Sequence, residues 1–85
     1  MTGFQSRPAA LTPEEFAHMG GLLYGAHWQA ELARALDVSL RNVQYMTAGD
    51  RTVHDGIARD LLNLLREQHA GQAEAIAQLE AKLEG

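Results

Sequence analysis

The stretch from Trp28 to Met46, WQAELARALDVSLRNVQYM, constrains the fold more than any other part of this sequence. It contains two amphipathic helical patterns of about nine residues each, joined by a short polar turn at Asp37. Ser39 is a favourable N-cap for the second helix. The predicted inner-face residues are Leu32, Ala33, Leu36, Val43 and Met46. Because Ala33 is small, the two helices can cross closely, and the stretch predicts two short helices packed on each other.

The residues before this stretch predict another helix. Thr12 is a suitable N-cap, Pro13 fits the first helical position, and Glu15 completes a capping box. The Gly20-Gly21 pair weakens this helix. Tyr24-Gly25 is expected to close it.

Two further helical patterns follow the central stretch. Val53 in the connector is expected to enter the core, and the periodicity predicts a helix from Gly56 to about His69 and another from Ala73 to Leu83. The apolar positions of the first are Ile57, Leu61, Leu64 and Leu65. The alternation typical of a β-strand does not occur in the sequence. The expected fold class is all-α, a compact domain of four to five helices.

Composition excludes several classes of function. With 85 residues, 46% of them hydrophobic, the chain is expected to form one small core. It has no cysteine for a disulfide or a thiolate metal site, and its four histidines show no metal-ligand spacing. We find no catalytic constellation and therefore predict no enzyme, no metal and no cofactor. Neither a signal peptide nor a membrane span is evident, so a cytoplasmic location without membrane contact is expected.

The net charge of −4 argues at first against a nucleic-acid partner, because phosphate binding requires Lys and Arg. The charge is distributed unevenly, however. Up to Arg59 there are five arginines and six acidic residues, a balance of −1, whereas from Asp60 onward there are two basic and five acidic residues, a balance of −3. The first two thirds of the chain can therefore present a locally basic face.

The segment from Gln29 to Ala48 resembles the DNA-binding helix-turn-helix of phage repressor and Cro-like (XRE-like) transcriptional regulators. The residues that carry the resemblance are Gln29, Leu32-Ala33, Val38-Ser39, Val43 and Met46. The similarity extends over roughly residues 11 to 65, and Asp37 stands where that family often has Gly. It implies a helix-turn-helix DNA-binding domain over residues 11–66. Residues 1–10 lack helical periodicity and are expected to form a flexible arm.

The resemblance also implies which side chains meet DNA. The second helix of such a motif enters the major groove with its N-terminal part. The residues expected to read base edges are Ser39, Leu40, Arg41, Gln44 and Tyr45. Those expected to contact phosphates are Gln29, Asn42 and Arg51. The predicted function is a sequence-specific regulator, a repressor or autoregulator, bacterial or phage-encoded, that binds double-stranded DNA. The alternative is a protein-interaction module with the same fold and no DNA binding, which the net charge permits.

A heptad pattern in the acidic tail predicts a dimer. With Leu62 at position a, the a and d positions are Leu62, Leu65, His69, Gln72, Ile76, Leu79 and Leu83, of which five are aliphatic. We therefore expect a C-terminal helical tail over residues 67–85 that pairs two copies, so that the homodimer binds a palindromic operator. The predicted dimerisation residues are Leu62, Leu65, Ile76, Leu79 and Leu83. The alternative is that residues 70–85 fray.

Overall fold

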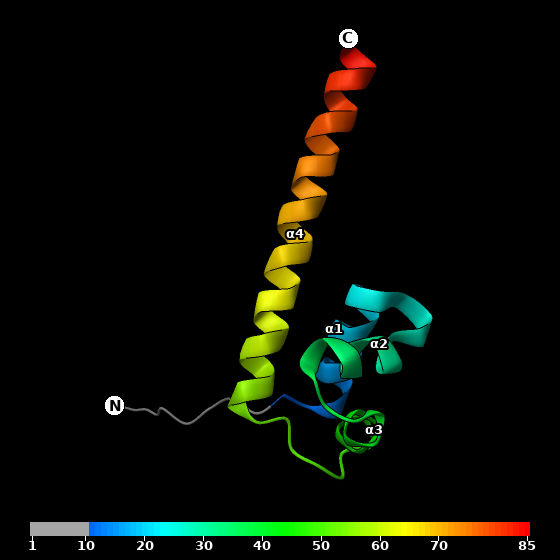
Figure 1. The fold of residues 1–85 in the computed structure, drawn as a ribbon, viewed down its shortest axis with the longest axis vertical. Coiled ribbons are helices and arrows are strands. Elements are labelled where there is room, and N and C mark those ends of the chain that lie inside the picture. The colour runs from blue at the N-terminus through cyan, green and yellow to red at the C-terminus, as the bar shows by residue number, and fades with distance from the viewer. Residues whose placement is uncertain (1–10) are drawn as a thin grey trace, which may run out of the picture.

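The computed structural model describes residues 11–85, which form helices (Figure 1). In chain order these are α1 (Pro13–Tyr24), the 3-10 turn η1 (Gly25–His27), α2 (Trp28–Leu36), α3 (Leu40–Ala48) and α4 (Asp55–Glu84). The only β-type pairing among these residues is an isolated bridge between Leu11 and Val53. The predicted all-α class is confirmed. The flexible arm predicted for residues 1–10 lies outside the described residues.

Helix α1 begins at the predicted capping box. The Glu15 N–H donates to Thr12 Oγ1 at 3.0 Å, and the Thr12 N–H donates to Glu15 Oε1 at 3.0 Å. The helix continues through Gly20 and ends at Tyr24, after which Gly25 has a φ of 80°. Gly20 is buried because the ring of Trp28 lies directly against it. Gly20, which has no Cβ, therefore makes room for Trp28, the first residue of α2.

Helices α1, α2 and α3 pack on one another around a core that α4 completes. Its buried hydrophobic residues are Phe16, Leu32, Ala33, Leu36, Val43, Met46, Val53, Ile57 and Leu61. They include all five inner-face positions predicted for the central stretch, and also Val53. The half-buried ring of Trp28 meets Phe16 edge-on, with ring centroids 5.7 Å apart.

The turn between α2 and α3 holds Asp37 in the left-handed conformation, with φ 58° and ψ 45°. Its N–H donates to the Arg34 carbonyl at 3.2 Å, and the Val38 N–H donates to the Ala33 carbonyl at 3.0 Å. These bonds satisfy carbonyl groups at the end of α2 that lack partners within the helix. Side chains other than glycine adopt this conformation at an energetic cost.

We expect Asp37→Gly to raise the free energy of unfolding by about 0.5–1 kcal/mol, because glycine adopts φ 58° without Cβ crowding. Urea denaturation followed by circular dichroism measures the change. Asp37→Ala is the matched control and should not raise the stability, because it keeps the Cβ that crowds this conformation. A glycine variant less stable than the parent would contradict this account of the turn.

Helix α4 corrects one expectation. We predicted two helices separated near Gly71, but a single helix runs from Asp55 to Glu84. Its N-terminal half packs against α1 and α2, and the Gln68 side-chain amide donates to the carbonyls of Leu22 and Leu23 at 3.2 and 3.4 Å. From His69 onward every residue is exposed. Gly71 does not interrupt the helix because the residues around it are mostly strong helix formers, which outweigh its cost of about 1 kcal/mol.

The length of α4 makes the molecule elongated, whereas the sequence predicted a compact domain followed by a C-terminal helical tail. The radius of gyration is 16.2 Å, against about 12 Å for a compact chain of 85 residues. Figure 1 shows the C-terminal half of α4 extending beyond the cluster of α1, α2 and α3. Although α4 has 30 residues, neither it nor any other helix in the described part of the chain has a stretch apolar enough to cross a membrane.

Candidate functional site

The outer face of α3 is left uncovered by the other helices of the described chain. Helix α3 packs against α1 and α2, whereas α4 packs against α1 and α2 but not against α3. Its exposed residues are Leu40, Arg41, Gln44, Tyr45 and Ala48. They fall on one side of the helix, because Val43 and Met46 occupy the buried side. The five residues predicted to read bases, Ser39 included, are thus all exposed and lie on or beside this face.

Arg51 adds a second guanidinium to the α3 face. Gly49, with a φ of 87°, ends α3 and reverses the chain, and the N–H groups of Asp50 and Arg51 donate to the Tyr45 carbonyl at 2.9 and 3.3 Å. The Arg51 guanidinium carbon lies 5.4 Å from the centroid of the Tyr45 ring, within the range of a cation–π contact. The connector therefore places Arg51 beside an exposed residue of α3.

Two of the predicted DNA-contacting side chains, Ser39 and Gln29, also stabilise the local structure. Ser39 Oγ accepts the Asn42 N–H at 3.0 Å and caps α3. The side-chain amide of the half-buried Gln29 donates to Thr47 Oγ1 at 3.3 Å, and this hydroxyl donates to the Val43 carbonyl at 2.8 Å. Gln29 thus connects the start of α2 to α3. Its amide has a second N–H and a carbonyl oxygen for other contacts.

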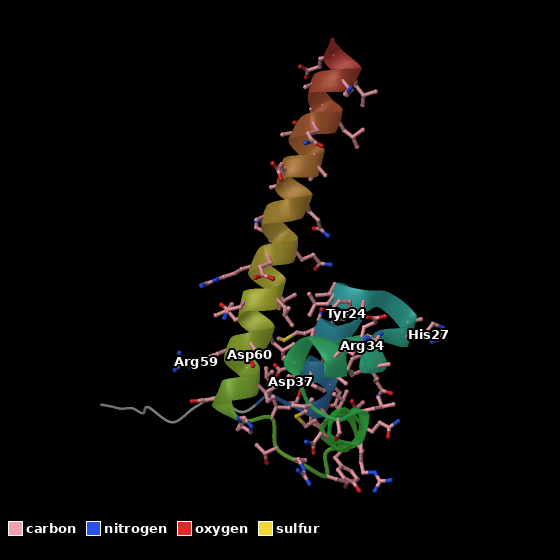
Figure 2. The ribbon with its side chains drawn as sticks, in the orientation of Figure 1. Tyr24, His27, Arg34, Asp37, Arg59 and Asp60 are labelled. Atoms are coloured by element: carbon pink, nitrogen blue, oxygen red, sulfur yellow. The ribbon has the colours of Figure 1, made fainter. Side chains whose placement is uncertain are left out.

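A hollow of about 450 Å³ lies where the N-terminus of α2 approaches the start of α3. It is lined by Ala26, His27, Trp28, Gln29, Ala30 and Leu40. The first N–H groups of a helix lack intrahelical partners and carry partial positive charge. His27 is exposed, and Figure 2 shows it at the edge of the helix cluster away from α4. The hollow thus lies beside a helix end suited to an anion, and its lining is both polar and apolar.

The exposed residues of α3 include one positively charged side chain and no negatively charged one. Helix α3 contains Arg41 and no acidic residue, and the neighbouring acids Asp37 and Asp50 lie beyond its two ends. The one salt bridge among residues 11–85 joins Arg34 to Glu31 on α2, at 2.6 Å. Arg41 and Arg51 therefore have no carboxylate partner within salt-bridge distance in the described chain.

Comparison with family models, with curated proteins and with solved structures finds no match to this chain. Its function is therefore inferred from the α3 face and the surfaces around it. Over residues 11–85, no group of three or more His, Cys, Asp or Glu side chains is placed to hold a metal ion.

Sequence patterns missed three features of this region. These are the bond from Gln29 to Thr47, the stacking of Arg51 on Tyr45, and the hollow beside Leu40. Each depends on how α2, α3 and the connector meet, and helical periodicity describes each helix separately. Tyr45 and Arg51 lie on either side of the end of α3, and their separation in the sequence does not by itself predict a contact between their side chains.

Proposed function

We propose that the protein binds double-stranded DNA in a sequence-specific manner, with α2 and α3 acting as a helix-turn-helix and α3 entering the major groove. The observation that carries this proposal is the uncovered α3 face, where Arg41 and Gln44 are exposed and no acidic residue intervenes. The N-terminal part of the second helix is the part that reaches base edges in this kind of motif. In the proposed complex α2 crosses the DNA backbone.

Each residue on the α3 face has a matching target on DNA. Arg41 can make two hydrogen bonds to O6 and N7 of guanine, and Gln44 can make two to N6 and N7 of adenine. Leu40, which is 42% exposed, can contact a thymine methyl group. Ser39 and Tyr45 complete the predicted base-reading set, and each has a hydroxyl that can donate or accept a hydrogen bond.

Phosphate contacts would set the position of α3 in the groove. Gln29 lines the hollow at the N-terminus of α2, where helix N–H groups favour an anion. Arg51 lies beside Tyr45 and carries a full positive charge to the opposite end of α3. Asn42, half-buried in the first turn of α3, is the third proposed phosphate contact. Such contacts fix register without reading sequence.

The low positive charge of one copy favours binding as a pair. Two copies double the phosphate contacts, and two-fold symmetry matches a palindromic operator whose half-sites are about 34 Å, or one helical turn, apart. Occupying such a site would repress or autoregulate transcription. We therefore propose a small transcriptional regulator that acts as a homodimer.

A second candidate is a protein-interaction module in which the α3 face binds another protein. The net charge of −4 favours it, because non-specific attraction to DNA is weak for an acidic chain. The two candidates differ in salt dependence. DNA affinity should fall steeply with salt, roughly in proportion to the number of neutralised phosphates, whereas the module should bind no duplex at low salt.

Selection of bound sequences from a random duplex pool tests the proposal directly. An enriched motif with two-fold symmetry is the expected result, since it would identify the partner class and the operator together. Enrichment of no motif, at low salt and at protein concentrations of tens of micromolar, would refute DNA recognition and favour the protein-interaction module.

We expect Arg41→Ala to weaken binding to the selected duplex by about 1–3 kcal/mol and to relax the preference at one base pair. The loss follows from removing two hydrogen bonds to one base. Fluorescence anisotropy with duplexes varied at single positions measures both effects.

Arg51→Ala provides the contrast, because a phosphate contact is independent of sequence. It should weaken binding to the selected and to unrelated duplexes alike and reduce the slope of log K against log salt by about one. An Arg41→Ala variant with parental affinity and specificity would show that α3 is not the reading surface.

A further inference from the structure

We propose that α4 pairs with α4 of a second copy of this chain in antiparallel orientation. The pairing does not depend on whether α3 binds DNA. The starting observation is that α4 continues to Glu84, while all residues from His69 onward are exposed. Most helical stability in proteins comes from the packing of an amphipathic face, so a partner surface would stabilise this segment.

The apolar residues of this segment form a stripe that continues into the domain. Ile76 is 57% exposed, Leu79 62% and Leu83 83%, and Leu62 within the packed half is still 46% exposed. Together with the half-buried Leu65 they occupy a and d heptad positions. The residues of α4 that contact the domain, Ile57, Leu61, Leu64 and Gln68, occupy the c and g positions. The stripe is therefore a separate face of the same helix.

The register of the pair follows from matching apolar with apolar positions. In an antiparallel pair, a positions face d positions of the other helix. Setting Leu62 opposite Leu79 of the second copy also sets Ile76 opposite Leu65. The same register places the two polar positions together, His69 opposite Gln72. A shift by one heptad would instead set Ile76 opposite Gln72 and His69 opposite Leu79, which buries polar against apolar groups.

Charges beside the stripe select the same register. Antiparallel helices bring e positions together, and this register sets Arg59 opposite Glu80 of the second copy, twice by symmetry. Both side chains are exposed, and neither has a salt-bridge partner within residues 11–85. Figure 2 shows Arg59 on the side of α4 away from α1, α2 and α3, so the domain does not obstruct it.

A parallel pair lacks this complementarity. When two parallel helices are in register, g positions of one helix contact e positions of the other. These contacts join Gln68 to Ala73 and Ala75 to Glu80, with no pair of opposite charges. The antiparallel pair also places both domains on one face of the paired helices, because the c and g positions that hold each domain lie on the side opposite the e positions.

Charge reversal tests the pairing in the full-length chain. Sedimentation equilibrium at low ionic strength should show a dimer at tens of micromolar. Arg59→Glu and Glu80→Arg should each raise the dimer dissociation constant about tenfold, because two attractive contacts become repulsive. The double variant should return to within about threefold of the parent. Glu74→Arg, an exposed change at the outward f position, is the matched control and should leave the constant unchanged.

Spin labels test the orientation, since the chain has no cysteine to interfere. Ala70→Cys lies near the centre of the pair and should give a short label distance, about 20 Å. Ala81→Cys should give about 30 Å or more, because a rise of 1.5 Å per residue separates the two sites along the helix axis. A monomer at tens of micromolar would overturn the pairing. A short Ala81 distance, or no rescue in the double charge reversal, would overturn the antiparallel orientation.

Discussion

Gly20→Ala is expected to lower the free energy of unfolding by about 3 kcal/mol, although helix propensity alone predicts a gain of about 1 kcal/mol. A Cβ at this position would overlap Cε3 of Trp28 and would lie 2.6 Å from its Cδ2. The indole ring cannot move aside freely, because its edge contact with the buried Phe16 holds it. Either α1 and α2 separate or the ring leaves its position.

Gly21→Ala is the matched control in the same helix. A Cβ added at Gly21 would have no atom within 4 Å outside the local helix backbone, so the substitution should raise the stability by about 0.5–1 kcal/mol. Urea denaturation of both variants, followed by circular dichroism and Trp28 fluorescence, measures the two changes in the free energy of unfolding, which should have opposite signs. If both substitutions stabilise the protein, the result would contradict the inference that the Trp28 ring lies too close to α1 for a Cβ at Gly20.

Removing the residues after Gln68 should weaken operator binding about 100-fold or more while the remaining domain stays folded. This prediction rests on both the DNA-binding and the pairing proposals. The core ends at Leu61, and Gln68 makes the last hydrogen bonds between α4 and α1. The deleted segment carries Ile76, Leu79 and Leu83, so the product should be a monomer, and losing the second binding site removes an avidity of about 10² or more.

Three measurements on the truncated chain separate the two proposals. Sedimentation gives its mass, circular dichroism its folding, and anisotropy its affinity for the selected duplex. A truncated chain that stays dimeric would show that the tail serves another purpose. A folded monomer that binds as tightly as the parent would show that one copy is sufficient for recognition.

Several elements could be predicted because their causes are local in sequence. The capping box from Thr12 to Glu15 and the Ser39 cap each involve residues within a few positions of one another. Inner faces follow from helical spacing for the same reason, and all five predicted positions between Leu32 and Met46 are buried. The exposed α3 face follows as the other side of that helix.

Other features could not be predicted from local patterns. At some positions two helix preferences oppose each other, and other features arise only where two helices pack together. At Gly71 the sequence suggested a break, but the sum of neighbouring helix propensities outweighs a single glycine. The domain assignment at residue 66 likewise divides what is one continuous helix. The reading of DNA by α3 and the pairing of α4 stay predictions, because each concerns a partner outside this chain.

The sequence by itself determined where α1, α2 and α3 begin, where α1 and α2 end, and which sides of α2 and α3 are apolar, because caps and periodicity act over three to seven residues. Only the tertiary structure decided that Gly20 is required by Trp28, that Gln29 bonds Thr47, and that Arg51 lies on Tyr45. It also decided that α3 stays uncovered while α4 extends beyond the domain. These contacts depend on the angles at which whole helices cross, and side-chain packing across the core sets those angles.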